Sequence, residues 1–181
     1  MFIKMTKVLL TYINSYMDNL IPIGVSVLSA CLKKAGHKTK LFDTTFYKTS
    51  EKTGDEARVE TLQVLPTDLS KFGIHKKNTN MAEDFKRAIR EFNPEIIGFS
   101  AVESTYHITL DLLKEIKDLR IPKIVGGIHA TMAGKEIIKN PNLDMICIGE
   151  GEEAIVELAD RIGSGKEYSD VRNLWIKKSG K

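Results

Sequence analysis

Short apolar runs alternate along the chain with longer segments in which apolar residues recur every three or four positions. The runs have the length and the β-branched content of buried strands, and the wider spacing is that of a helix with one apolar face. Strands are therefore expected at 7–12, 38–43, 95–100, 123–126 and 145–149. Helices are expected at 24–35, 81–92, 105–119, 133–139 and 152–162.

This alternation of strands and helices predicts right-handed crossovers and a parallel sheet covered on both faces. Five such units predict an α/β sandwich of three layers, flavodoxin-like or Rossmann-like, with a five-stranded parallel sheet of order 2-1-3-4-5. In open sheets of this class, ligands lie beyond the carboxyl ends of the strands, near the point where the strand order reverses. The loops that follow the strands are therefore the candidate site.

Two regions depart from this alternation. Residues 44–80 are too many for an ordinary connection, are rich in Lys, Thr and Glu, and predict a variable lid or partly mobile insertion. Residues 171–181 predict one strand that enters a Ser-Gly turn with no returning strand after it. We therefore expect one domain over 1–165, and in 166–181 the start of a hairpin or a linker to a downstream domain missing from this chain.

Composition narrows the function classes. With 181 residues and 42% apolar content, the chain can build a single core. The formal net charge is only +3 and the basic residues are scattered among acidic ones, so no nucleic-acid partner is expected. No apolar run approaches the roughly 20 residues of a membrane span, and the N-terminus lacks a signal-peptide pattern. The expected location is cytoplasmic, without a membrane partner.

The two cysteines, Cys31 and Cys147, both lie inside apolar periodic segments. This position is typical of reduced, buried thiols in a cytosolic protein. Two cysteines so far apart cannot supply an iron–sulfur cluster, which commonly takes three or four. No metal ligands are predicted in this chain.

The loop after the first predicted strand, 13–24, excludes two nucleotide-binding classes. A flavin mononucleotide site of this fold needs a loop rich in Ser, Thr and Gly there, but this loop is apolar and has no glycine before Gly24. A dinucleotide site needs G-x-G-x-x-G after the first strand, and this motif is absent there. Thr11-Tyr12 and Ser100-Ala101 offer no acidic pocket for phosphoryl transfer. A large, mostly apolar ligand edge remains.

Five short motifs occur in order along the chain: Pro22-Ile23-Gly24, Lys34-Ala35-Gly36-His37, Pro94-Glu95-Ile96-Ile97-Gly98-Phe99-Ser100, Gly126-Gly127-Ile128-His129-Ala130-Thr131 and Gly149-Glu150-Gly151-Glu152. Taken together over about residues 5–165, the chain resembles the cobalamin-binding domain that precedes the catalytic barrel in many radical S-adenosylmethionine enzymes. The resemblance implies a corrin ring over the carboxyl edge, with a nucleotide tail that can enter between the strands.

The resemblance gives the double glycine Gly126-Gly127 a role, because residues without side chains leave room for that tail. The alternative is that the two glycines only make a tight strand-to-helix turn with positive φ. Ser100 would offer its hydroxyl to the tail or to the corrin edge, or would serve as a helix N-cap or loop serine.

Many cobalamin proteins place a cobalt-binding histidine in an Asp-x-His-x-x-Gly motif in the first loop. The matching window here is Asn19–Gly24, with Ile21 where the histidine would stand. The resemblance therefore implies base-off binding against an apolar surface, with no protein imidazole on cobalt. The candidate cofactor-binding residues that it implies are Tyr16, Asn19, Ile21, Gly24, Ser100, Ala101, Val102, Glu103, Gly126, Gly127, His129, Glu150 and Gly151.

Several of these residues have a structural alternative. His129 is interpreted as a groove residue that packs or hydrogen-bonds, not as a catalyst. Glu150 and Glu152 fit a helix N-terminus, where the macrodipole favours acids, or else contact cofactor amides or a following domain. Glu103 either lines the pocket or begins an exposed helix, and Tyr16 either covers a corrin face or belongs to the core.

The chain lacks the Cys-x-x-x-Cys-x-x-Cys motif that radical chemistry of this family requires, so no catalytic residue is predicted in it. The resemblance implies a cobalamin-binding module that acts with a downstream radical S-adenosylmethionine barrel in cis, often for methyl transfer. The iron–sulfur cluster and S-adenosylmethionine would bind only in that barrel. Two alternatives stay open: an interaction or scaffold domain that has lost the cofactor, and an enzyme for a small nucleotide or acyl ligand.

Overall fold

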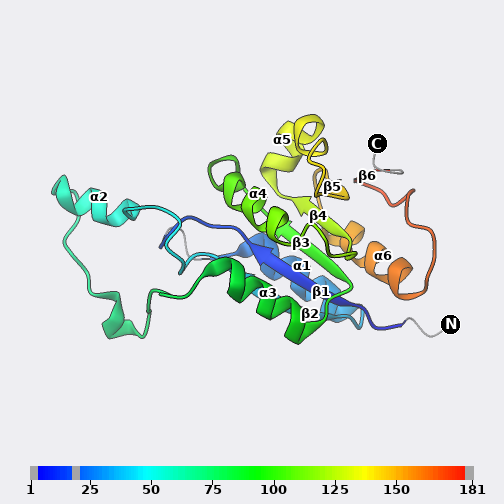
Figure 1. The fold of residues 1–181 in the computed structure, drawn as a ribbon, viewed down its shortest axis with the longest axis horizontal. Coiled ribbons are helices and arrows are strands. Elements are labelled where there is room, and N and C mark those ends of the chain that lie inside the picture. The colour runs from blue at the N-terminus through cyan, green and yellow to red at the C-terminus, as the bar shows by residue number, and fades with distance from the viewer. Residues whose placement is uncertain (1–3, 18–20, 178–181) are drawn as a thin grey trace.

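The computed structural model describes residues 4–17 and 21–177, which form one central sheet between layers of helices (Figure 1). The sheet has the order β2-β1-β3-β4-β5-β6. Its strands are β1 (Lys7–Tyr12), β2 (Lys38–Asp43), β3 (Ile96–Ser100), β4 (Lys123–Gly126), β5 (Met145–Cys147) and β6 (Leu174–Ile176). The helices are α1 (Ile23–Lys34), α2 (Gly54–Glu60), α3 (Met81–Phe92), α4 (Tyr106–Glu115), α5 (Ile128–Ile137) and α6 (Glu152–Gly163), with short 3₁₀ turns η1 (Leu69–Phe72) and η2 (Glu103–Thr105).

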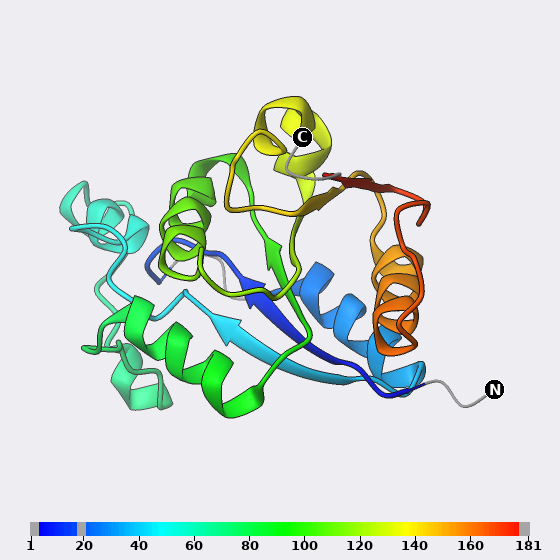
Figure 2. The same cartoon turned by 45° about the vertical axis from the view of Figure 1, so that its right-hand side comes forward.

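Two apolar clusters fill the spaces on either side of the sheet, because successive strand residues point to opposite faces. Leu9 and Phe99 belong to the cluster under α3, α4 and α5. Leu10 and Ile124 belong to the cluster under α1 and α6. Figure 2 shows α1 and α6 together on one side of the sheet and α3 and α4 on the other. The three-layer α/β architecture expected from the sequence is confirmed.

The prediction of a five-stranded, wholly parallel sheet is wrong in one respect. The first five strands are parallel in the expected order, but a sixth, β6, pairs antiparallel with β5 through Met145↔Ile176 and Cys147↔Leu174. The apolar pattern identifies the strand but not its partner, which depends on how residues 164–173 turn the chain back. The pairing covers the edge that β5 would otherwise expose.

Helix α5 begins directly after Gly127 and not at 133 as expected. Its first turn exposes Ile128 and Met132, so it lacks the apolar stripe by which a helix is recognised in a sequence. The helix is also kinked at Ala133, where φ is −118° and ψ is 25°. None of the described helices is long and apolar enough to cross a membrane.

Residues 44–80 contain α2 and η1 and extend away from the sheet in Figure 1. The helix α2 has no buried residue, and its N-terminus is closed by a capping box. The Thr53 side chain accepts a bond from the Glu56 amide (3.0 Å), while the Glu56 carboxylate accepts one from the Thr53 amide (2.8 Å). We call residues 44–80 the insertion.

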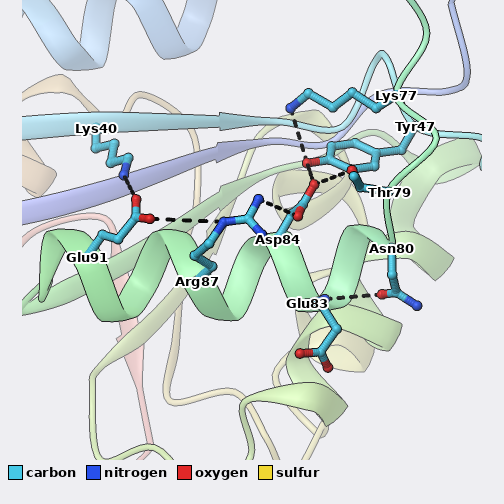
Figure 3. Close-up of polar contacts among 9 residues, drawn as sticks. All are labelled: Lys40, Tyr47, Lys77, Thr79, Asn80, Glu83, Asp84, Arg87 and Glu91. Atoms are coloured by element: carbon cyan, nitrogen blue, oxygen red, sulfur yellow. Dashed lines mark hydrogen bonds and ion pairs between the residues drawn. The ribbon is translucent and has the colours of Figure 1, made fainter.

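The insertion is tied to α3 at both of its ends by one carboxylate (Figure 3). Asp84 Oδ2 accepts hydrogen bonds from the Tyr47 hydroxyl (2.9 Å) and from the Thr79 hydroxyl (2.5 Å). The Arg87 guanidinium nitrogen Nη2 lies 2.5 Å from the other carboxylate oxygen, Asp84 Oδ1. Burial, and then Asp84, raises the pKa of Tyr47, while bonding from Thr79 lowers the pKa of Asp84 despite its burial.

Candidate functional site

A cavity of about 200 Å³ opens at the carboxyl end of the sheet, on the face covered by α1 and α6. Both helices begin at this end and pack against each other. The cavity is lined by Leu10, Thr11, Gly24, Val25, Leu28, Gly98, Phe99, Ser100, Ile124, Gly126, Gly127, Cys147, Gly149, Glu150, Gly151, Glu152 and Ile155. We call this the carboxyl-edge cavity.

Missing side chains on two central strands create the cavity. Gly98 and Gly126 lie on the face of the sheet that carries Leu10 and Ile124, and register pairs Gly98 with Ile124. A Cβ atom at Gly98 would meet Leu10 Cδ2 at 3.4 Å, and one at Gly126 would meet Cys147 Cβ at 3.6 Å. These are ordinary contacts, so neither glycine is required by its immediate neighbours. Their effect is to leave the space beyond them open.

Gly127 is required for a different reason. Its φ of 99° lies in the left-handed region, and a Cβ atom there would stand only 2.8 Å from the carbonyl oxygen of Ala101. The interpretation that the double glycine makes a tight turn therefore applies to Gly127. The interpretation that a glycine leaves room for a ligand is consistent with the position of Gly126.

The floor of the carboxyl-edge cavity is apolar and uncharged. Leu10, Val25 and Ile124 are all buried there, as is Cys147. Burial, followed by the nearby Glu152 and Glu150 carboxylates, raises the pKa of the Cys147 thiol to about 11. The thiol is therefore protonated at neutral pH, and its Sγ lies 3.8 Å from the Glu150 carbonyl oxygen, to which it donates a weak bond.

The loop between β5 and α6 forms the mouth of the cavity and is held by two side chains that the sequence analysis did not assign. The Gly149 amide donates to the Thr131 hydroxyl (2.9 Å), and the Asn173 side chain donates to the Glu150 carbonyl (2.9 Å). Gly149 has a φ of 72°. Glu152 occupies the first turn of α6, where an acid suits the helix dipole.

Six of the candidate residues line the carboxyl-edge cavity: Gly24, Ser100, Gly126, Gly127, Glu150 and Gly151. Ser100 ends β3 and does not cap a helix, because the N-cap residue of η2 is Val102. Ala101 and Val102, again with Ser100, line a neighbouring hollow of about 190 Å³ at the ends of β1 and β3. Glu103 is exposed in the turn that follows.

The other candidates lie elsewhere. Tyr16 is buried and its ring is covered by the ammonium group of Lys76, 4.9 Å from the ring centre. His129 packs against Tyr106, with ring centres 4.8 Å apart. Ile21 is 69% exposed. Asn19 lies outside the described residues.

No histidine lines the carboxyl-edge cavity within residues 4–17 and 21–177. His37 lies at the opposite end of the sheet, where it accepts a bond from the Thr6 amide (3.2 Å). His75 lies in the insertion, beside a separate hollow of about 840 Å³, and His107 lies on α4. The described cavity wall thus offers no imidazole to a metal.

Gly98, Leu28 and Cys147 belong to the cavity although the sequence analysis did not single them out as site residues. A glycine inside a strand often marks a site where a ligand or another backbone segment approaches closely, so Gly98 could have been recognised from the sequence. Leu28 and Cys147 carried none, because each sits at an ordinary apolar position of a helix or strand.

Proteins with related sequences and folds are considerably longer than this chain. The cytidylyl-2-hydroxyethylphosphonate methyltransferase of Streptomyces wedmorensis is 26% identical over 167 residues, which is 88% of this chain and 28% of that protein. The radical S-adenosylmethionine methyltransferase TsrM from Kitasatospora setae matches with a TM-score of 0.72 at 17% identity, over 96% of this chain and 29% of its own. The cobalamin-dependent S-adenosylmethionine radical enzyme OxsB matches with a TM-score of 0.67 at 18% identity, over 99% of this chain and 22% of its own.

These structural matches show the fold, and the chain spans less than a third of each of these proteins. A family model matches more directly. The model described as the B12 binding domain covers residues 10–159, from within β1 to within α6. This chain therefore belongs to the B12 binding domain family.

Proposed function

We propose that this chain is the cobalamin-binding module of a longer radical S-adenosylmethionine enzyme. The observation that carries the proposal is the carboxyl-edge cavity, which opens at the end of the sheet where ligands of this fold class bind. Its volume of about 200 Å³ accommodates a bicyclic aromatic base of the kind that ends the nucleotide tail of cobalamin. Gly126, at the end of β4, leaves the path into the cavity open, and Ser100 places a hydroxyl at the cavity wall.

The segments that follow the strand ends support a large apolar ligand above the cavity. Exposed apolar side chains occur on the segments that follow β1, β3 and β4: Ile21, Ile23, Val102, Ile128 and Met132. Such side chains at one end of a sheet are typical of a binding surface. A bound corrin would supply cobalt chemistry, commonly methyl transfer in this class of enzyme. The residues of this chain would bind the ring, orient it and exclude water from its lower face.

We further propose that cobalamin binds in the base-off state without a histidine ligand. Ile21 stands in the position of the cobalt-binding histidine of other cobalamin proteins and is largely exposed. The four histidines of the chain lie away from the cavity wall, as described above. The absorption spectrum of bound methylcobalamin distinguishes cobalt with and without an axial nitrogen, and a base-on spectrum would contradict this part of the proposal.

The proposed partner is a radical S-adenosylmethionine barrel that follows in cis and holds the iron–sulfur cluster and S-adenosylmethionine. The support is that this chain corresponds to 22–29% of larger methyltransferases and radical enzymes, and that it carries only two cysteines. A cytoplasmic location and the absence of a nucleic-acid partner belong to the same proposal.

The test is to mix the protein with hydroxocobalamin, remove free ligand on a desalting column and record the visible spectrum. We expect retained corrin, and we expect Gly126→Leu to lose cobalamin because its side chain enters the cavity. Gly54→Leu is the matched control, since a side chain at Gly54 has nothing within 4 Å and no left-handed φ. A protein that retains no corrinoid in any form would overturn the proposal and favour the scaffold alternative.

A further inference from the structure

We propose that the carboxyl-edge cavity selects the lower base of the corrinoid, accepting a benzimidazole and rejecting a purine such as adenine. This inference rests on the proposed cobalamin-binding function and specifies the chemical class of ligand. Corrinoids with either base share the same ring, so the discrimination must come from the residues that surround the nucleotide tail.

The side chains of the cavity floor offer almost no hydrogen-bonding atoms. Leu10, Val25, Ile124 and Ile155 are each at most 5% exposed, and all are aliphatic. Thr11 also borders the cavity, but it follows Leu10 in β1 and its side chain points to the opposite face with Leu9. The Thr11 hydroxyl therefore does not serve a ligand in this cavity.

The backbone groups of the cavity floor are also already hydrogen-bonded within the sheet. The three strands beneath the cavity pair in the sheet, with Leu10 opposite Gly98 and Gly98 opposite Ile124. Their amide and carbonyl groups lie in the plane of the sheet and bond to one another, as is usual for a central strand. A base resting on this floor finds no free backbone group to bond.

Few polar groups remain near the floor. The Cys147 thiol donates its weak bond to the Glu150 carbonyl, and the Glu150 side chain is exposed at the mouth. Glu152, in the first turn of α6, also lines the cavity, and an ionised carboxylate accepts hydrogen bonds but donates none. Ser100, at the end of β3, provides a hydroxyl. One hydroxyl suits a benzimidazole released from cobalt, which has a single ring nitrogen to satisfy. Adenine adds an exocyclic amino group and further ring nitrogens. The added ring nitrogens are acceptors, to which a carboxylate cannot donate, so they would be buried without partners at a substantial cost.

The test is the affinity of the protein for cobalamin, for the corresponding adenine corrinoid and for cobinamide, which lacks the nucleotide tail, measured by titration calorimetry. We expect cobalamin to bind about tenfold or more tightly than the adenine form, since two or more unpaired buried ring nitrogens are together worth at least that factor. Equal or tighter binding of the adenine form overturns the selection but leaves cobalamin binding intact. If no corrinoid binds, cobinamide included, the proposed function fails and this inference with it.

A pair of variants tests whether the apolar cavity wall causes this selection. Leu28 lies partly buried at the cavity wall, 3.4 Å from where a Gly151 side chain would begin, so Leu28→Gln places an amide beside the base. We expect this change to reduce the preference for cobalamin over the adenine form by several-fold. Val27→Gln makes the same kind of change at an exposed neighbouring position and should keep the preference. A Leu28 variant that behaves like the Val27 control contradicts the inference.

Discussion

Gly127 and Ala101 lie so close that a single added carbon atom at Gly127 would stand 2.8 Å from the Ala101 carbonyl oxygen and 3.3 Å from its nitrogen. The Ala101 amide also donates to the carbonyl of Gly126 at 3.3 Å. The ends of β3 and β4 are thus joined immediately beyond the sheet, next to the carboxyl-edge cavity. The two adjacent glycines consequently differ in what a substitution would do.

Gly127→Ala should destabilise the protein, whereas Gly126→Ala should not. At Gly127 the new Cβ meets backbone in a left-handed conformation, and we expect a loss of about 1–3 kcal/mol or more in the free energy of unfolding. At Gly126 the Cβ makes an ordinary 3.6 Å contact with Cys147, so the change should stay within about 1 kcal/mol. Urea denaturation of both variants measures the difference. Equal losses would show that the approach of Gly127 to Ala101 carries no constraint.

Asp84→Ala should release the insertion from α3. Without the carboxylate, the buried Tyr47 hydroxyl loses its acceptor and the Thr79 hydroxyl loses its own, which should cost about 1–3 kcal/mol. Limited proteolysis should cut residues 44–80 faster in this variant. Glu91→Ala on the same helix is the control, because Glu91 makes only exposed ion pairs, with Lys40 and Arg87, and should contribute little. Unchanged proteolysis in Asp84→Ala would exclude the carboxylate as the tie.

The free energy of unfolding should fall at both low and high pH because of Asp84 and Tyr47. The pKa of Asp84 is lowered in the folded protein, so its contribution is present above the unfolded carboxyl pKa and is lost as pH falls through the folded one. The pKa of Tyr47 is raised above 10.0, so its contribution is present below pH 10.0 and is lost at higher pH. Tyr47→Phe should therefore flatten the alkaline decline in the free energy of unfolding and leave much of the acid decline. An alkaline slope that persists in Tyr47→Phe would assign it to other groups.

The sequence predicted the strands well because parallel, buried strands are continuous apolar runs. Residues 123–126 illustrate this, since the observed β4 has the same bounds. The pattern could not give the partner of β6, because pairing depends on the path of the whole chain. It also placed the start of α5 too late, because that start is fixed by the conformation of Gly127 and not by an apolar stripe.

The candidate site was predictable as a location but not as a cavity. The rule that ligands lie beyond the strand ends, together with the glycine pairs, indicated Gly126 and Gly151, and both line the observed cavity. Leu28 and Cys147 could not be found, because an apolar side chain borders empty space only when its neighbours in the sheet lack side chains. The bond from Gly149 to Thr131 joins residues 18 apart and follows from the start of α5, which the pattern missed.

Cys147 provides a chemical probe of whether cobalamin enters the carboxyl-edge cavity. The pKa of its thiol is raised from 9.0 to about 11, mainly by burial, so at pH 8 the thiolate population should be about a hundredfold smaller than that of an unperturbed thiol. In a Cys31→Ala background, we expect iodoacetamide to label Cys147 slowly in the folded protein, faster as pH rises toward 11, and rapidly in urea. Bound cobalamin should slow the labelling further because the tail fills the space in front of the sulfur, whereas cobinamide should protect much less. Equal protection by the two corrinoids would place the tail outside this cavity even if the protein binds cobalamin.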